Sequence, residues 1–213
     1  MLPMPAPPLP EPLPDDPLPL VKSWIDDAST RVRNATAMAF ATVEPDGRPA
    51  ARMVICRGFD VDAGWFVFYT DRVSAKGRAL DLSPRGSAVF YWEPFDRQVR
   101  IDGPVTLAPE ADVETYWRTR PRDARIAAII SEQSQPIPSR ASMVTRFEEA
   151  MARYRDDVPR PARWIGYRLW AERVELWVSQ PARLHDRAEW RRTLEPSGDE
   201  FKGGPWRATR LQP

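Results

Sequence analysis

The chain has 213 residues, of which 42% are hydrophobic, so it can form one large domain with a sizeable core. Its 31 basic and 30 acidic side chains nearly cancel, which argues against generic nucleic-acid binding and against a polybasic membrane anchor. Having only one cysteine and one histidine excludes an internal disulfide and argues against a dedicated transition-metal site.

The N-terminal segment is rich in proline, because residues 1–19 hold nine of the 24 prolines. Proline fixes φ and removes a backbone donor, so we expect residues 1–17 to form a disordered arm ahead of one domain over residues 18–213. Such an arm is either a solvated tail, which we favour, or a ligand for a proline-reading module. The segment lacks the pattern of a secretory signal, and no stretch reaches the ~20 apolar residues of a membrane helix. These features predict a soluble cytoplasmic protein.

The first half of the domain reads as one helix followed by antiparallel strands. Residues 18–30 carry apolar side chains at helical spacing, and Pro19 suits a first helical turn. The segments that follow are strand-like, and turn signals such as residues 44–47 separate them. We expect a short helix over 74–82 and strands over 37–43, 49–56, 64–70, 87–92 and 98–107.

The second half reads as a helical insert followed by more strands. Helices are expected over 109–118, 122–131 and 139–154, and strands over 164–170, 173–178, 183–187 and 206–211. Residues 195–204 are expected to form a polar loop. No βαβ alternation or internal repeat is visible. The order predicts a mainly β protein with helices (α+β), an antiparallel barrel closed by strands from both halves.

The stretch Arg183-Leu184-His185-Asp186-Arg187 contains the only histidine. If it is a strand, alternation puts Arg183, His185 and Arg187 on one face, where their positive charges repel unless an anion or an electron-rich ring lies against them. A phosphate ester or an aromatic ring would suit. The alternative is a solvated edge strand whose charges are balanced by nearby carboxylates.

Other polar residues stand at predicted strand ends and helix starts, where ligand groups often gather. A helix start is a favourable place for an anion because its backbone N–H groups are free. These residues are Arg52, Arg57, Tyr69, Thr70, Ser74, Lys76, Gln98, Tyr116, Arg120, Arg122, Gln133 and Ser134.

In this order, the residues resemble the pyridoxamine 5'-phosphate oxidase family, FMN-dependent split-barrel enzymes that make pyridoxal 5'-phosphate. The resemblance runs from about residue 13 to residue 213 and implies an antiparallel split β-barrel with a helical insert. Each motif is weak alone, but together, in order and at family spacing, they are specific. The motifs are Arg52-Met53-Val54-Ile55, Phe68-Tyr69-Thr70, Arg97-Gln98-Val99, Tyr116 with Arg120-Pro121-Arg122-Asp123, Gln133-Ser134, Arg183 to Arg187, and Arg210-Leu211-Gln212-Pro213.

The resemblance implies a set of FMN-binding residues. Arg52 and Lys76 would neutralise the phosphate of FMN, Thr70 or Ser74 would add hydroxyl donors, and the amides of Gln98 and Gln133 would meet the flavin ring. For Tyr69 and Trp177 the alternative is that they are simply core aromatics. The set comprises Arg52, Met53, Val54, Ile55, Cys56, Arg57, Tyr69, Thr70, Ser74, Lys76, Gln98, Gln133, Ser134, Trp177 and Arg187.

The resemblance also implies a substrate site. Arg57, Tyr116 and Arg120 would hold the phosphate of pyridoxamine or pyridoxine 5'-phosphate, while Arg183, Leu184 and His185 would lie at its ring, with Arg183 and His185 as the catalytic pair. FMN would accept the hydride, and O2 would reoxidise it to give hydrogen peroxide. Family members build each FMN site from both subunits, so a homodimer with FMN at the interface is implied.

Three substitutions depart from the family pattern. Arg57 stands where the family usually has lysine, Ala75 replaces an arginine that helps hold the FMN phosphate, and Ala124 replaces a serine that assists the substrate phosphate. The N-terminal arm is rich in proline, whereas the family's segment is basic and bears a tyrosine. We therefore expect weaker FMN binding and an altered substrate preference.

Two alternative functions remain open. One is a related FMN oxidase of the phenazine-biosynthesis type, which oxidises reduced tricyclic intermediates; Arg57 and Arg120 argue instead for a phosphorylated substrate. The other is a non-catalytic split barrel that carries a flavin, pyridoxal phosphate, haem or a deazaflavin. The Arg183 and His185 pair, which a carrier does not need, favours an enzyme.

Overall fold

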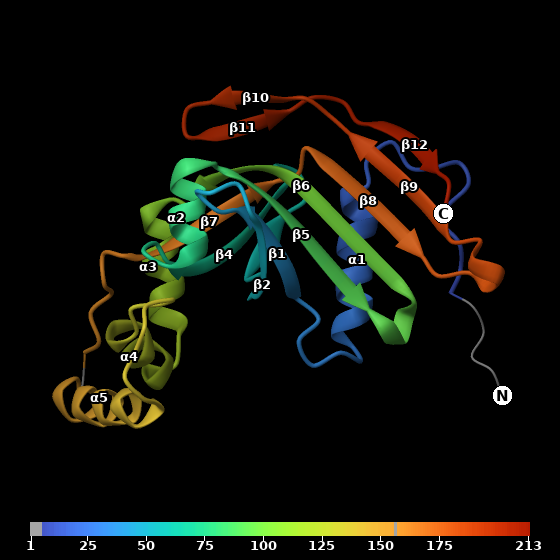
Figure 1. Cartoon of the computed structure of the whole chain (residues 1–213). Helices are drawn as coiled ribbons and strands as arrows, with labels where there is room; N and C mark the ends of the chain where they lie inside the picture. The colour runs from blue at the N-terminus through green and yellow to red at the C-terminus, as the bar shows by residue number, and fades with distance from the viewer. Residues whose placement is uncertain (1–5, 156) are drawn as a thin grey trace.

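The fold is a curved antiparallel sheet with one helix under its concave face and a group of helices beside one end (Figure 1). The computed structural model describes residues 6–155 and 157–213. Within these residues the helices are α1 (Leu18–Ser29), α2 (Ala75–Leu82), α3 (Glu110–Thr119), α4 (Arg122–Ile130) and α5 (Arg140–Arg153). The strands are β1 (Ala37–Val43), β2 (Pro49–Ile55), β3 (Gly58–Asp60), β4 (Trp65–Asp71), β5 (Arg85–Trp92), β6 (Arg97–Leu107), β7 (Trp164–Trp170), β8 (Arg173–Val178), β9 (Asp186–Arg191), β10 (Leu194–Ser197), β11 (Glu200–Gly203) and β12 (Arg207–Leu211).

Strand β6 is where the sheet divides. Its first part, residues 97–102, pairs with β8, and its last part, residues 105–107, pairs with β7. The path β12-β9-β8-β6-β5-β1-β2 forms one half, and β7, β4 and β3 form the other. Gly103 stands at the division, because a Cβ there would lie 1.9 Å from the carbonyl oxygen of Trp170. This is the predicted split barrel, closed by strands from both halves of the chain.

The main core lies between the sheet and α1. Apolar residues recur at helical spacing, so Val21, Trp24, Ile25 and Ala28 are buried on one stripe. Alternate residues of the strands, such as Phe40 on β1, meet them from the sheet. The transfer of side chains such as Val21, Ile25 and Phe40 out of water stabilises the fold by roughly 1.5–3 kcal/mol each.

A second, smaller core joins the helical insert to the sheet. Trp117 and Ile126, from α3 and α4, pack with Trp164 of β7. The indole Nε1 of Trp117 donates to the carbonyl oxygen of Val158 at 3.0 Å, so its polar atom is satisfied inside this core. This core holds the insert beside the end of β4.

The predicted disorder of the N-terminal arm does not hold for residues 6–17, and residues 1–5 lie outside the described chain. Leu9 is buried, its N–H donates to Asp186 at 2.7 Å, and the indole of Trp190 donates to the carbonyl oxygen of Pro14 at 2.8 Å. The segment passes beside β9 and β12 (Figure 1). Prolines lack a backbone donor but keep a carbonyl acceptor, and the carbonyl group of Pro14 ties the segment to β9.

Three other local predictions need correction. Residues 183–187 were expected to be one strand, but Pro181–Arg183 forms the 3₁₀ turn η2 and β9 begins only at Asp186. The expected polar loop over 195–204 is the hairpin β10–β11, and β3 was not predicted. The remaining helices and strands lie within two residues of their expected bounds. Within residues 6–155 and 157–213, no helix is long and apolar enough to cross a membrane.

Candidate active site

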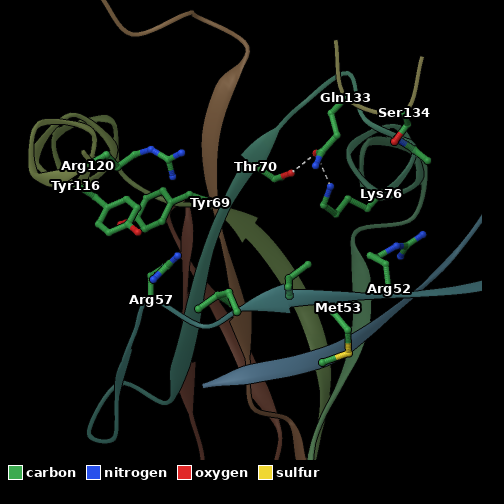
Figure 2. Close-up of a pocket in the computed structure, with 13 residues that line it drawn as sticks. Arg52, Met53, Arg57, Tyr69, Thr70, Lys76, Tyr116, Arg120, Gln133 and Ser134 are labelled. Atoms are coloured by element: carbon green, nitrogen blue, oxygen red, sulfur yellow. Dashed lines mark hydrogen bonds between the residues drawn. The ribbon is translucent and has the colours of Figure 1, made fainter. Parts of the chain in front are cut away.

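A cavity of about 380 Å³ opens where the edge strand β2 meets the end of β4, the start of α2 and the helical insert. Figure 2 shows cationic side chains at both of its ends. Four of the lining residues carry a positive charge, and among the residues that the structure describes no carboxylate lines it. The lining residues are Arg52, Met53, Val54, Ile55, Arg57, Tyr69, Thr70, Ala75, Lys76, Tyr116, Arg120, Gln133 and Ser134.

One end of the cavity is organised around Lys76, in the first turn of α2. Its Nζ donates to Gln133 Oε1 at 2.7 Å and to Ser74 Oγ at 3.1 Å, and Thr70 Oγ1 donates to the same Gln133 oxygen at 2.8 Å. Ser74 begins the helix, since its Oγ accepts from the N–H of Gly77. Both partners of the ammonium are neutral, so this end keeps its positive charge for a ligand.

The surroundings of Lys76 disfavour the charged form of its side chain. The side chain is buried, and this desolvation, with the nearby charge of Arg52, lowers its pKa from 10.5 to about 8, although Asp71 opposes the shift. An anion placed here would favour the protonated form and offset the cost of burying the charge.

This pKa predicts a pH dependence for anion binding. As the pH rises through about 8, Lys76 of the free protein loses its proton, so the affinity for FMN should fall. Fluorescence titrations from about pH 7 to about pH 9.5 measure the effect. The Lys76→Met variant is the control, because it has no proton to lose there. A wild-type affinity that stays constant across this range would contradict the assignment.

Arg52 extends the same end from β2. Its guanidinium donates to Thr42 Oγ1 at 2.7 Å and to the carbonyl oxygen of Phe40 at 3.3 Å, and it forms an ion pair with Glu44 at 3.3 Å. Alternation along β2 sends Arg52 to one face and Met53 to the other. The three acceptors on and next to β1 hold the guanidinium over the cavity.

The other end of the cavity is built from aromatic rings and two arginines. Tyr69 and Tyr116 stack with ring centroids 4.2 Å apart, and Arg57 lies 6.0 Å from the centre of the Tyr116 ring. Arg120 lies over Trp164, and its Nε is buried with no hydrogen-bond partner among the described residues. Burial lowers the pKa of Arg120 from its usual value. A buried donor without a partner suits an anionic ligand.

The predicted site residues divide between this cavity and other places. Ten of the predicted FMN residues line it, and so do Tyr116 and Arg120. Ser74 lies buried behind Lys76, and Cys56 is buried with its thiol on the carbonyl oxygen of Gly58. Ser74 and Cys56 therefore do not line the cavity, and six more predicted residues lie outside it: Gln98, Trp177, Arg183, Leu184, His185 and Arg187.

Three of those six form a row across the sheet. Gln98 pairs with Trp177, and Trp177 pairs with Arg187, on β6, β8 and β9. The His185 ring lies 4.7 Å from the Trp177 ring. Because Val99 and Leu176 point into the core, the row faces the opposite, outer side of the sheet. We call Gln98, Trp177, His185 and Arg187 the outer row.

Arg183 and His185 do not share a strand face as expected. Ala182 and Arg183 have φ of 55° and 61°, a region that side-chain-bearing residues rarely adopt. The N–H of Gln180 donates to His185 Nδ1 at 3.2 Å and so closes the turn. Alternation therefore does not apply, although His185 and Arg187 still come together at Trp177.

Sequence reasoning missed the residues that hold the predicted ones in place. Glu175, on β8, is buried and accepts from Arg187 at 2.7 and 3.0 Å. Glu44 pairs with Arg52. At Ala75, already identified as a departure from the family pattern, the backbone N–H donates to Ser134 Oγ. Only the strand register, which puts Glu175 two positions from Trp177, the partner of Arg187, could have indicated the first of these contacts.

The chain is similar to characterised families over nearly its whole length. Residues 25–154 match the family described as Pyridoxamine 5'-phosphate oxidase, and residues 164–213 match the Pyridoxine 5'-phosphate oxidase C-terminal dimerisation region. A Pyridoxine/pyridoxamine 5'-phosphate oxidase of Gluconobacter oxydans (strain 621H) is 41% identical over 200 residues, which cover 93% of this chain and 94% of that protein. The protein of the same name from Sphingopyxis alaskensis is 44% identical over 181 residues, covering 84% and 83%.

Solved structures agree with the fold. PhzG from Burkholderia lata 383, in complex with tetrahydrophenazine-1-carboxylic acid, matches with a TM-score of 0.81 and 30% identity and covers 94% of both chains. A pyridoxamine 5'-phosphate oxidase-related, FMN binding protein from Nostoc punctiforme PCC 73102 matches at 0.72 with 20% identity, over 92% of this chain and 96% of that one, and shows the same fold. With family matches over both halves of the barrel, the chain belongs to the pyridoxamine 5'-phosphate oxidase family.

Proposed function

We propose that this protein is an FMN-dependent oxidase that converts pyridoxamine or pyridoxine 5'-phosphate to pyridoxal 5'-phosphate, reducing O2 to hydrogen peroxide. The proposal rests on one observation: a single cavity has positively charged side chains at both ends and no carboxylate among its described lining residues. Two phosphorylated ligands, a cofactor and a substrate, need such an arrangement. The relatives that cover nearly the whole chain bear the names of this activity.

The Lys76 end fits the phosphate of FMN. Lys76 and Arg52 supply charge, while the hydroxyl of Ser134 and the N–H of Ala75 lie beside them at the start of α2. FMN, when bound, would supply the hydride acceptor and pass the electrons to O2. Strand β2 is an edge strand and lines the cavity, so its unpaired main-chain groups can form hydrogen bonds with the flavin ring.

The Arg120 end fits the phosphate of the substrate. Arg57, Arg120 and the hydroxyl of Tyr116 can bind its oxygens, and the unpartnered Nε of Arg120 gains an acceptor. A phosphate held there fixes where the reacting carbon of the substrate lies. These residues would therefore contribute to catalysis by orienting the substrate. Arg183 and His185 would close over the ring.

A second copy of the chain would bring the outer row to this cavity. Gln98, Trp177 and Arg187 face outward in their own chain, and on the same face Tyr91 and Met53 are 55% and 64% exposed. Exposed apolar side chains on a sheet face favour association. Residues 164–213, which match a dimerisation region, include most of the outer row. These features support a homodimer with FMN between the copies.

Purified protein tests this function directly. We expect a yellow sample with the absorption of bound flavin, and hydrogen peroxide formed on addition of pyridoxamine or pyridoxine 5'-phosphate. The unphosphorylated vitamers are the matched control, because they cannot use the Arg120 end. Flavin-bound protein that forms no peroxide from either phosphate would sink the proposed substrate.

A second candidate is an FMN oxidase acting on reduced tricyclic compounds. It is favoured by the likeness to the PhzG structure, which was solved with tetrahydrophenazine-1-carboxylic acid. Such a substrate has no phosphate, so Arg120→Met would leave its turnover unchanged while lowering kcat/KM for the vitamer phosphates by at least about tenfold. Comparing both substrates with both proteins separates the two functions.

A further inference from the structure

Arg163, in the loop before β7, joins the two walls of the cavity without lining it. Its Nε donates to Asp71 Oδ2 at 2.8 Å, at the end of β4. Its Nη2 donates to the carbonyl oxygen of Ile129 at 2.6 Å and to those of Ala128 and Ser131 at 3.2 Å. One guanidinium thus ties the C-terminal end of α4 to the turn between β4 and α2.

Asp71 shapes that turn. It is 7% exposed, and its Oδ1 accepts from the N–H of Val73 at 2.9 Å while its carbonyl oxygen accepts from the N–H of Ser74 at 3.1 Å. The N–H of Arg72 in turn donates to the carbonyl oxygen of Arg163 at 2.7 Å. The turn carries Thr70 on one side and the start of α2 on the other.

The end of α4 leads directly to Gln133 and Ser134. The final carbonyl groups of a helix lack partners within it, and a cation there also favours the helix dipole, so Arg163 fixes the direction in which the chain leaves α4. Ser134 has a φ of 73°, a left-handed conformation that costs energy for a residue with a side chain, so the surrounding contacts must hold it. The contacts across the cavity, Gln133 with Thr70 and Lys76, depend on this placement.

We propose that Arg163 and Asp71 are positioning residues for the FMN phosphate: they hold the segment bearing Gln133 and Ser134 against the start of α2, so that the donors at the Lys76 end converge. The proposal rests on the proposed function. Neither residue lines the cavity, so each acts through the residues that do. Asp71 is buried whereas Arg163 is partly exposed, so loss of Arg163 leaves a buried carboxylate without its partner and should disturb the turn and the segment after α4.

The test compares Arg163→Met with Arg160→Met. Arg160 lies in the same loop and also makes ion pairs, but with Glu110 and Glu114 on α3, away from the Lys76 end. We expect Arg163→Met to raise the dissociation constant for FMN by about tenfold or more, with kcat at saturating FMN changed by less than about twofold. Arg160→Met should lower the melting temperature but leave FMN affinity near the wild-type value. Equal FMN affinity in Arg163→Met and wild type would overturn the proposal.

A double-mutant cycle and hydrogen exchange complete the test. Asp71→Asn should weaken FMN binding as well, and the double variant should lose less than the sum of the two single losses. Amide exchange of residues 131–135 in FMN-free protein should quicken in Arg163→Met and not in Arg160→Met. Failure of wild type to bind FMN would count against the proposed function alone. The amide exchange of FMN-free protein would still show whether Arg163 holds residues 131–135 in place. Unchanged amide exchange of these residues in Arg163→Met would overturn the positioning role of Arg163.

Discussion

Replacing Lys76 with methionine is expected to weaken FMN binding by about 10- to 100-fold, because a hydrogen bond to a charged group contributes roughly 1.5–3 kcal/mol. Methionine keeps the length and apolar stem of the side chain but removes the ammonium that contacts Gln133 and faces the proposed phosphate position. Fluorescence titration of FMN-free protein measures the change. Lys22→Met, on the exposed side of α1, is the matched control and should bind FMN as wild type does.

The same substitution should stabilise the protein without FMN. Because the pKa of Lys76 is lowered in the folded state, the folded protein binds the proton less well than the unfolded chain does. Carrying the charge therefore costs folding free energy in full below about pH 8, and the cost fades as the pH rises from about 8 towards 10.5. The melting temperature of FMN-free Lys76→Met should exceed that of wild type at neutral pH, and the difference should shrink at higher pH. A lower melting temperature at neutral pH would refute this account.

Combining two impaired variants in one dimer is expected to restore activity. Arg120→Met removes a cation from the cavity, and Arg183→Met removes an exposed cation from the turn before β9, which does not line the cavity of its own chain. If each site takes Arg120 from one copy and Arg183 from the other, a hybrid dimer has one intact site and one site with both defects. It should show about half the wild-type activity, whereas each parent dimer should lose at least about tenfold in kcat/KM.

Co-expression with two different affinity tags and sequential purification isolates the hybrid. Peroxide formation from pyridoxamine 5'-phosphate is the measurement, and hybrids of each variant with wild type are the controls for tag effects. Were the whole site formed within one copy, every site of the hybrid would carry one defect. A hybrid no more active than its parents would therefore refute the shared site.

Local sequence patterns predicted most of the fold because most of its elements are specified locally. The apolar stripe of α1 and the alternation of β1 are visible in short windows, and both elements form where expected. The turn at Arg183 was missed because two residues with side chains adopt left-handed φ there, which composition does not indicate. The N-terminal segment was missed because its carbonyl groups find donors that lie about 175 residues away in sequence, such as the indole of Trp190.

The candidate site was predicted less completely, for a related reason. Family resemblance identified Lys76, Gln133 and Arg120, which the structure brings to one cavity. It did not identify Arg163 or Asp71, whose contacts span 92 residues and have no signature in either segment. Whether the outer row binds FMN stays a prediction, since within one chain it faces away from that cavity.

The division of the sheet at Gly103 has an evolutionary consequence. No side chain can be added there without pushing against the end of β7, and β7 sets the register of Tyr69 and Thr70 through its pairing with β4. A side chain at this position would therefore shift β7 and, through its pairing, β4, which forms part of the cavity wall. Exchange of one barrel half between relatives should therefore succeed only where the parent that supplies β6 has a glycine at this crossing.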